Sequence, residues 1–334
     1  MTDMTPYQEM AASIGLGDSK MAPELFAMIV DQEEAKVVLA ASPPKTVSEI
    51  AAEVEMPEDK TQELLEGLFV KGLIYKSKKP DATRYYKFRS FIQFHDGTVL
   101  TPGISQEYLD AWQKFEEEEL EQMKLQTKDL DFRQGMRVVP VNVAIESQSQ
   151  IAVFEDVAKM IDEAEKIAVT NCSCRVIHGI TDVPLEVCMQ MNKAAHYALE
   201  RGTGRELTRD EAMDMLRMCE EEGLVHTVDN KLGMGYLICN CDKNGCGNWG
   251  PAQRAYAKKF CAPSRFKALV DADACSSCET CVDRCFFDAI TMTGENDTAL
   301  VDAEKCMGCG LCVPTCPEEC ISYEEMQPQE FIPE

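Results

Sequence analysis

The sequence lacks long apolar segments and is poor in basic residues. No run of 18 apolar residues occurs, so we expect no membrane-spanning helix. The opening residues, Met1 to Pro6, contain neither the basic nor the apolar segment of a secretory signal, and we therefore expect a cytoplasmic protein with reduced cysteines. Lysine and arginine total 33 against 58 aspartate and glutamate, and the net charge is -25. This balance disfavours a nucleic-acid partner, because phosphate binding needs a basic surface.

Patterns that mark a catalytic site are also missing. The sequence contains no Rossmann fingerprint, nucleophile elbow or catalytic triad pattern. We therefore name no catalytic residue, and the sequence leaves open whether the chain is itself an enzyme. Its 334 residues, 45% of them hydrophobic and 27% charged, are typical of a soluble protein with two or three domains.

Cysteine, by contrast, is abundant: the chain has 17, and eight of them form a doubled pattern near the C-terminus. Each half reads Cys-x2-Cys-x2-Cys-x3-Cys, and the second half follows the first at an offset of 31 residues. The first half contains Cys275, Cys278, Cys281 and Cys285, and the second contains Cys306, Cys309, Cys312 and Cys316. This spacing is typical of two-cluster iron-sulfur ligation, in which the fourth cysteine of each half binds the other cluster. A zinc site or a disulfide framework is the alternative.

With this pattern, residues 270–323 resemble a bacterial-type dicluster ferredoxin domain, and we expect two 4Fe-4S clusters. Cluster A is assigned Cys275, Cys278, Cys281 and Cys316, and cluster B is assigned Cys306, Cys309, Cys312 and Cys285. One departure from the family is that Phe286 follows Cys285 where a proline is usual, whereas Pro317 follows Cys316. We expect a small change of the backbone there and no lost ligand.

Six cysteines in the middle of the chain form a second group: Cys172, Cys174, Cys188, Cys239, Cys241 and Cys246. The first two follow a predicted buried strand over 166–170, and a predicted helix that starts at Pro184 carries Cys188. The last three lie in a Gly/Asn-rich segment, and Arg175 would offset thiolate charge. Residues 166–247 resemble a region found beside dicluster ferredoxin domains in iron-sulfur proteins of anaerobes. We expect four of the six to bind a third 4Fe-4S cluster; a zinc site, or free thiols or a redox pair, are the alternatives.

Three other cysteines are expected to be structural. Cys219 falls on the core side of a helix over 208–222 that a capping box at Thr208 begins. Cys261 has no partner at a useful spacing. Cys320 stands where the repeat has Ala289, and we expect it to pack as a small apolar residue.

Residues 22–90 predict three helices followed by a hairpin. A helix over 22–42 precedes a short helix capped at Thr46, a helix over 58–71 and two strands around 73–75 and 84–88. This order resembles a winged helix-turn-helix fold. The predicted reading helix exposes several acidic residues, which favours a protein-docking or structural role over DNA binding, although the hairpin is basic.

A polar helix is expected over 106–131, with the run Glu116 to Glu119 facing solvent. We predict an α+β fold with these parts: a winged-helix-like domain (1–103), an acidic helical connector (104–135), a Cys-rich middle domain (136–262), a dicluster ferredoxin domain (263–323) and an extended tail (324–334).

Electron transfer is the function that the cysteines favour. We expect an electron-transfer protein or a subunit of an anaerobic oxidoreductase complex, which relays single electrons to a partner protein or catalytic subunit with a basic docking face. A redox-sensing transcriptional regulator, or an iron-sulfur enzyme with a catalytic middle cluster, is the alternative.

Overall fold

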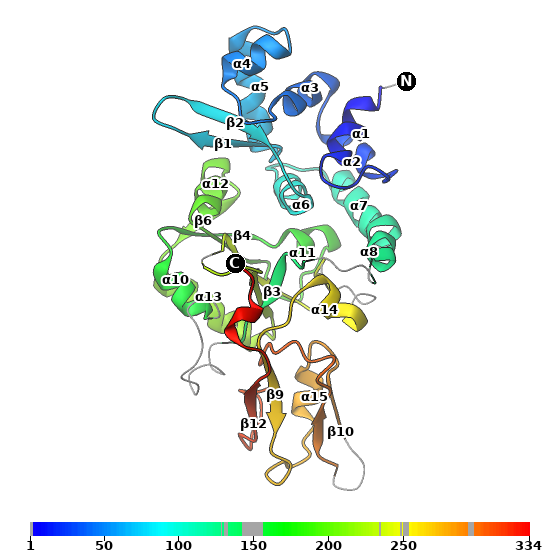
Figure 1. Cartoon of the computed structure of the whole chain (residues 1–334), viewed down its shortest axis with the longest axis vertical. Helices are drawn as coiled ribbons and strands as arrows, with labels where there is room; N and C mark the ends of the chain where they lie inside the picture. Colours follow the sequence, from blue (N-terminus) through cyan, green and yellow to red (C-terminus); the bar gives the residue numbers. More distant parts are fainter. Residues whose placement is uncertain are drawn as a thin grey trace. The chain divides into compact units, whose positions relative to one another are not determined.

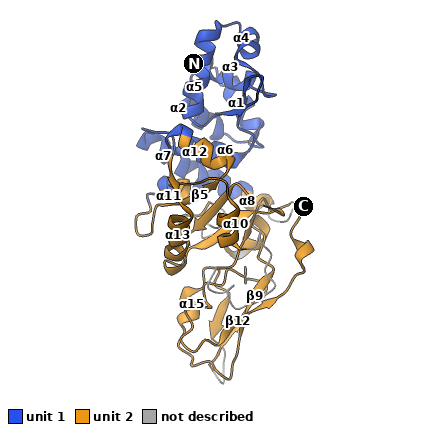
Figure 2. Ribbon diagram, turned by 90° about the vertical axis from the view of Figure 1, so that its left-hand side faces the viewer, with its two compact units in different colours: residues 1–123, 176–179, 200–203 blue, residues 124–175, 180–199, 204–334 orange. Residues whose placement is uncertain are grey.

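The computed structural model of the chain describes residues 3–127, 129, 133–141, 156–233, 235–247, 249, 254–292 and 297–334. The chain divides into two compact units, one of residues 1–123, 176–179 and 200–203 and one of residues 124–175, 180–199 and 204–334 (Figure 2). Helices and sheets are both present, which confirms the predicted α+β class (Figure 1). Over the described ranges, no helix has the length and apolar character needed to cross a membrane.

The first unit begins with five helices: α1 Thr5–Ala12, α2 Ala22–Ile29, α3 Gln32–Ala40, α4 Val47–Glu53 and α5 Glu58–Val70. The single helix predicted over 22–42 is wrong. The backbone is extended at Val30, and a capping box formed by Asp31 and Glu34 then begins α3. The capping box predicted at Thr46 is confirmed, because its side chain accepts a hydrogen bond from the backbone N–H of Glu49.

Gly72 ends α5 with a left-handed φ of 80°. A Cβ atom at this position would lie 2.4 Å from the backbone of Gly97, so only glycine fits without displacement. The chain then enters the predicted hairpin, in which β1 Ile74–Lys78 pairs antiparallel with β2 Thr83–Lys87.

A nearly continuous helical segment follows α6 Phe91–Val99: it comprises α7 Gln106–Phe115, a π-helical turn η1 Glu116–Leu120 and α8 Glu121–Thr127. Part of the helix predicted over 106–131 lies outside the described residues. The first unit has an aromatic core in which Phe94 packs between Phe26 and Trp112, with ring centroids 4.0 and 4.9 Å away.

The second unit contains a six-stranded antiparallel sheet with the strand order β3-β7-β8-β5-β4-β6. Its strands are β3 Met136–Val138, β4 Ile167–Asn171, β5 Glu186–Met191, β6 Gly204–Leu207, β7 Val225–Asp229 and β8 Leu237–Cys241. Helices α10 Val157–Glu163 and α13 Arg209–Glu221 share a buried core with these strands. Two further helices, α11 Ser173–His178 and α12 Lys193–Arg201, follow β4 and β5, and their last residues, from 176 and from 200 onward, belong to the first unit. The capping box at Thr208 and the buried position of Cys219 on α13 are confirmed.

The helix predicted to begin at Pro184 is wrong, because Cys188 lies in strand β5. Burial alternates along this strand, with Val187, Met189 and Met191 buried and the residues between them partly exposed. This alternation is the two-residue period of a strand with one buried face.

The C-terminal part of the second unit contains two short two-stranded sheets. β9 Phe266–Val270 pairs with β12 Ile321–Glu325, and β10 Ile290–Met292 pairs with β11 Ala299–Val301. Short helical segments are η3 Arg254–Tyr256, α14 Ala257–Phe260, α15 Thr280–Arg284 and η4 Gln329–Phe331. Each sheet therefore combines one strand from each half of the sequence repeat.

The repeat is also visible in the backbone conformation. Three residues of the first half have a positive φ, and so do their counterparts 31 positions later: Ser277 with Gly308, Glu279 with Gly310, and Asp288 with Glu319. The φ angles of Asp288 and Glu319 are 52° and 50°. The backbone is thus alike three residues after the fourth cysteine of each half, and the small change expected directly after Cys285 stays a prediction.

Candidate metal centres

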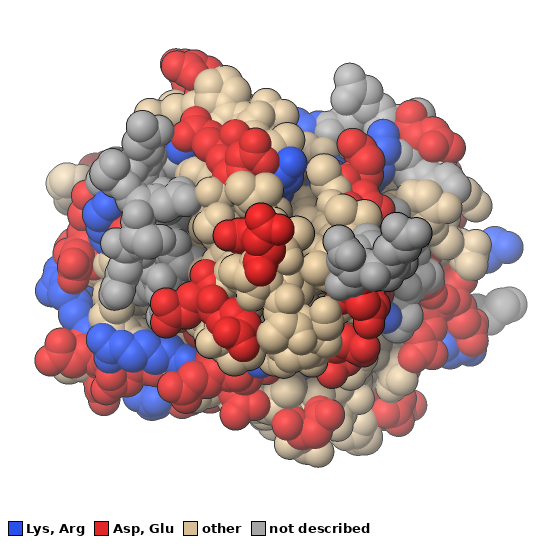
Figure 3. Space-filling view, turned by 90° about the horizontal axis from the view of Figure 1, so that it is seen from below, with Lys and Arg blue, Asp and Glu red and all other residues tan. Residues whose placement is uncertain are grey.

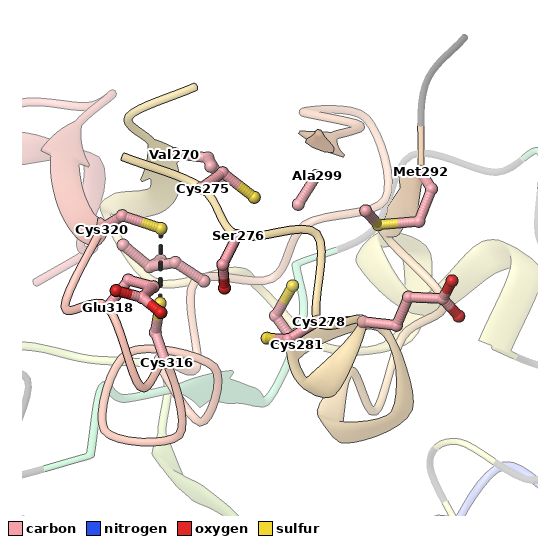
Figure 4. Close-up of a pocket in the computed structure, with 12 residues that line it drawn as sticks. Val270, Cys275, Ser276, Cys278, Cys281, Met292, Ala299, Cys316, Glu318 and Cys320 are labelled. Carbon is pink, nitrogen blue, oxygen red and sulfur yellow. Dashed lines mark hydrogen bonds between the residues drawn. The ribbon is translucent and has the colours of Figure 1, made fainter. Parts of the chain in front are cut away.

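The first candidate centre is a pocket at β9, β12 and the loop that precedes α15 (Figure 4). It is lined by the sulfur-bearing residues Cys275, Cys278, Cys281, Cys316 and Cys320, together with apolar side chains that include Val270, Met292 and Ile321. Cys278 is exposed, and a hydrogen bond of 3.4 Å from the Thr280 hydroxyl to its sulfur lowers its pKa. Ser276, Glu279 and Glu318 complete the lining, and the gathering of several thiols in one pocket suits a thiolate-bound metal cluster.

The second candidate centre is a pocket lined by Cys285, Cys306, Cys309 and Cys312, with apolar neighbours that include Phe287, Ile290 and Leu311. Burial raises the pKa of Cys309 to about 12 and that of Cys312 well above its ordinary value. Since metals bind the thiolate form, filling this pocket must release protons.

Each pocket takes three cysteines from one half of the repeat and the fourth from the other half. Cys316 joins the sulfurs of the first half, and Cys285 joins those of the second. The structure therefore brings together the two sets of sulfurs predicted for cluster A and cluster B. The role of each cysteine as a ligand stays a prediction.

Cys320 has a position that the sequence interpretation missed. It is buried, as expected, but its sulfur lies 3.3 Å from the sulfur of Cys316 and not only among apolar side chains. The sequence signal for this proximity is that Cys320 follows Cys316, the last cysteine of the repeat, by only four residues.

All six middle cysteines lie at one end of three adjacent strands. Cys172 directly follows β4, Cys174 lies in the first turn of α11 and Cys188 lies on β5. The other three lie on β8 and in the loop after it: Cys239, Cys241 and Cys246. Hydrogen bonds join the thiols in the order 174, 172, 188, 239, 241 and 246. The structure thus brings the whole predicted group together.

Two of these thiols have lowered pKa values. Hydrogen bonds from Cys174 and Cys188 hold the pKa of Cys172 well below its ordinary value, and the charge of Arg175 adds to this effect. Hydrogen bonds with Cys239 and Cys246 likewise lower the pKa of Cys241. Cys172 and Cys241 therefore favour the thiolate, which is the metal-binding form of cysteine. Hydrogen bonds with Cys188 and Cys241 instead raise the pKa of Cys239 well above its ordinary value.

Arg175 is fixed beside this group by buried polar contacts. Its guanidinium lies 3.0 Å from the Asp242 carboxylate and donates to the carbonyl oxygens of Pro184 and Asn240. Asp242 also accepts hydrogen bonds from the N–H groups of Asn244 and Gly245 and so shapes the loop before Cys246. Asp242 separates two of the cysteines in sequence, yet in the structure it positions the cation beside them.

The thiols of the middle group contact one another directly. Among the described residues, no three or more His, Cys, Asp or Glu side chains surround a point suited to a single metal ion.

Glu116 is buried in the first unit, so the prediction that the whole run 116–119 faces solvent is wrong for this residue. Its carboxylate lies 3.1 Å from Nε2 of His95 and 2.9 Å from Nε2 of His178. Burial raises the pKa of Glu116, but hydrogen bonds from His178 and His95 outweigh this and lower it to about 2. Burial opposes protonation of His95, but hydrogen bonds with Asp96 and Glu116 raise its pKa to about 10.

Comparison with known families places the C-terminal part of the chain. Residues 268–323 match the family described as a 4Fe-4S dicluster domain. No curated protein and no solved structure matches the chain. The match includes all eight cysteines of the doubled pattern and supports 4Fe-4S clusters and an iron-sulfur electron-transfer role for this domain.

Proposed function

We propose that this protein is an electron-transfer protein or a subunit of an anaerobic oxidoreductase complex in the cytoplasm. Single electrons pass through cluster A and cluster B of the C-terminal domain and through a third cluster held by four of the six middle cysteines. The observation that carries the proposal is the pair of four-cysteine pockets within residues that match a 4Fe-4S dicluster domain. Such clusters supply one-electron chemistry, and the protein tunes them by burial and hydrogen bonds.

A shared core supports electron passage between the middle cysteines and cluster B. Cys241, Cys246 and Trp249 belong to the same buried cluster as Phe286 and Phe287. Cys285, Cys306 and Cys309 pack against this cluster. The sulfurs assigned to cluster B and those of the middle group thus border one continuous interior.

A partner with a basic docking face fits the charge of the C-terminal domain. Residues 268–323 contain 11 acidic and two basic residues, so their net charge is 2 minus 11, or -9. Acidic side chains are prominent on the face shown in Figure 3, and basic ones are few near its centre. Complementary charge would steer such a partner toward the clusters.

The regulator hypothesis draws support from the order of α2 to β2, which fits a winged-helix-like domain. Three cations of the hairpin are, however, engaged within the first unit. Lys76 pairs with Glu66 and Glu200, Lys78 also pairs with Glu200, and Arg84 pairs with Asp81. These pairs reduce the positive charge offered to DNA phosphates, so we rank a docking or structural role first.

Metal analysis of anaerobically purified protein tests the proposal. We expect about 12 irons and an equal amount of acid-labile sulfide per chain, whereas about eight would remove the third cluster from the proposal, at four irons per cubane. Cys309→Ser should lower the iron content by about four, and Cys241→Ser should do so only if the middle group holds a cluster. One zinc beside about eight irons would replace the third cluster by a zinc site. A protein without iron would contradict the whole proposal.

A gel-shift titration with random-sequence and promoter DNA tests the regulator hypothesis. The electron-transfer proposal expects no binding at physiological salt in either redox state. Tight binding that depends on salt and on the redox state would reverse the ranking.

A further inference from the structure

We infer that Cys320 is a reserve ligand of cluster A, able to replace Cys316 as the fourth thiolate. This inference rests on the proposed presence of cluster A. It concerns a ninth cysteine of the C-terminal domain, outside the doubled pattern.

The geometry places the Cys320 sulfur among the sulfurs assigned to cluster A. It lies 3.3 Å from the sulfur of Cys316, and both line the pocket that also contains Cys275, Cys278 and Cys281 (Figure 4). The backbone of Cys320 is held in place because its carbonyl accepts a hydrogen bond of 2.8 Å from the N–H of Asp271. Little movement is therefore needed to exchange one sulfur for the other.

The internal repeat shows that the fold does not need a sulfur at this position. Ala289 stands at the equivalent place in the first half, four residues after Cys285. It is buried like Cys320, and its N–H donates a hydrogen bond of 3.2 Å to the sulfur of Cys285. The matching φ angles of Asp288 and Glu319 show that the local backbone is alike in the two halves. An alanine thus satisfies the packing, and the thiol of Cys320 adds chemistry that the second pocket lacks.

The exchange is a balanced ligand substitution. The Cys320 thiol loses its proton and forms a bond to the iron that Cys316 has held, and the Cys316 thiolate leaves that iron and accepts a proton. No electron is transferred, so the step needs neither an oxidant nor a reductant.

Four variants, produced and purified anaerobically, test the inference by iron and sulfide content. Cys316→Ala should keep the iron content of the wild type, because Cys320 completes cluster A. The double variant C316A/C320A should lose about four irons, at four per cubane. Cys285→Ala should also lose about four, since Ala289 cannot replace the lost thiolate, and C285A/A289C should regain them.

Spectroscopy separates ligand exchange from simple retention of iron. The electron paramagnetic resonance signal of reduced cluster A should be altered in Cys316→Ala, because its fourth ligand has a new position, and unaltered in Cys320→Ala. Far-ultraviolet circular dichroism checks that each variant is folded.

Loss of about four irons from folded Cys316→Ala, as from Cys285→Ala, would overturn the inference. So would full iron retention in C316A/C320A, or loss of cluster A from Cys320→Ala, which would make Cys320 the primary ligand. A wild-type protein without iron would instead refute the proposed function, and the two failures are thus distinguishable.

Discussion

Exposure differs sharply among the cysteines of the two C-terminal pockets. Cys278 of the first pocket is exposed, whereas Cys309 of the second is only partly exposed and Cys312 is buried. Solvent exposure controls how easily oxidants and chelators reach a metal-thiolate site. The two proposed clusters should therefore differ in stability although their ligand spacing is the same.

We predict that a chelator added with a mild oxidant removes iron from cluster A before cluster B. The loss should be biphasic, with about four irons in the faster phase. The variant Cys309→Ser should lack cluster B, and the iron of its cluster A should be lost quickly. The variant Cys281→Ser should lack cluster A, and the iron of its cluster B should be lost slowly. Absorbance and free iron measured over time check the prediction, and equal rates in the two variants would contradict it.

The ion pairs of Glu116 predict a pH dependence of stability. The pKa of His95 rises from its ordinary 6.5 to about 10 on folding, so protonated His95 stabilises the fold fully below pH 6.5 and loses this effect as the pH rises toward 10. His95→Gln should cost about 3–5 kcal/mol of unfolding free energy at pH 6, since it breaks a buried ion pair.

Urea unfolding of the wild type and His95→Gln from pH 6 to pH 10 measures this effect. The difference between the two proteins should shrink as the pH rises through that range, while the titration of cysteine thiols is common to both. A difference that is constant with pH would show that His95 is neutral in the folded state.

Close backbone approach decides the geometry of one element junction in the first unit. The end of α5 at Gly72 meets α6 at Gly97 so closely that neither glycine has room for a side chain. Gly103 has a similar φ of 76° but no atom within 4 Å of a built Cβ. Substitutions at Gly72 and Gly103 therefore distinguish two contributions to the free energy of unfolding: the strain of a left-handed backbone, which both positions share, and steric crowding, which only Gly72 has.

We predict that Gly103→Ala costs about 1–2 kcal/mol, the usual cost of a left-handed conformation for an L-residue. Gly72→Ala should cost roughly twice that or more, because the steric overlap adds to the same backbone strain. Chemical unfolding of both variants, followed by circular dichroism, provides the comparison. Equal losses would mean that α5 and α6 move apart easily.

Signals within a few residues of sequence predicted many of the helices and strands. The wrong predictions concern elements that depend on contacts between distant parts of the chain. The capping boxes at Thr46 and Thr208 mark helix starts within a few residues of sequence. Strand β5, by contrast, depends on pairing with β4 and β8, which proline and leucine before Cys188 do not reveal.

The candidate sites show the same division between local and distant information. The spacing alone was enough to divide the eight C-terminal cysteines into two groups of four. The repeat determines the loop that carries three cysteines of each group, and the fourth cysteine of each half lies in the other pocket. The contacts of Glu116 with histidines 21 and 62 residues away left no periodic pattern. The contact between Arg175 and Asp242 could not be predicted for the same reason, because the two residues lie 67 positions apart in the sequence.

Charge acts at the scale of the whole molecule. With a net charge of -25, the protein should attract cationic redox partners from a distance and repel anionic ones. Screening by salt shortens the range of this attraction to about 8 Å at physiological ionic strength.

We predict that the second-order rate of electron transfer to a cationic acceptor protein falls about tenfold or more between low and high salt. The rate with an anionic acceptor of similar potential should rise under the same change, and this acceptor serves as the control. Stopped-flow absorbance measures both rates. A rate with the cationic acceptor that does not depend on salt would show that charge attraction does not select the redox partner.

The aromatic contacts at the edge of the second pocket give the molecule an optical reporter of its own. Trp249 is fully buried, and its ring centroid lies 5.6 Å from that of Phe286 and 5.2 Å from that of Phe287, the two residues that follow Cys285. The chain has one other tryptophan, Trp112, which belongs to the other compact unit. Because iron-sulfur clusters absorb where indole emits, Trp249 should fluoresce brightly in the empty protein and darken as cluster B is inserted. Maturation could then be watched in real time without an added dye, with a Trp112→Phe variant isolating the signal.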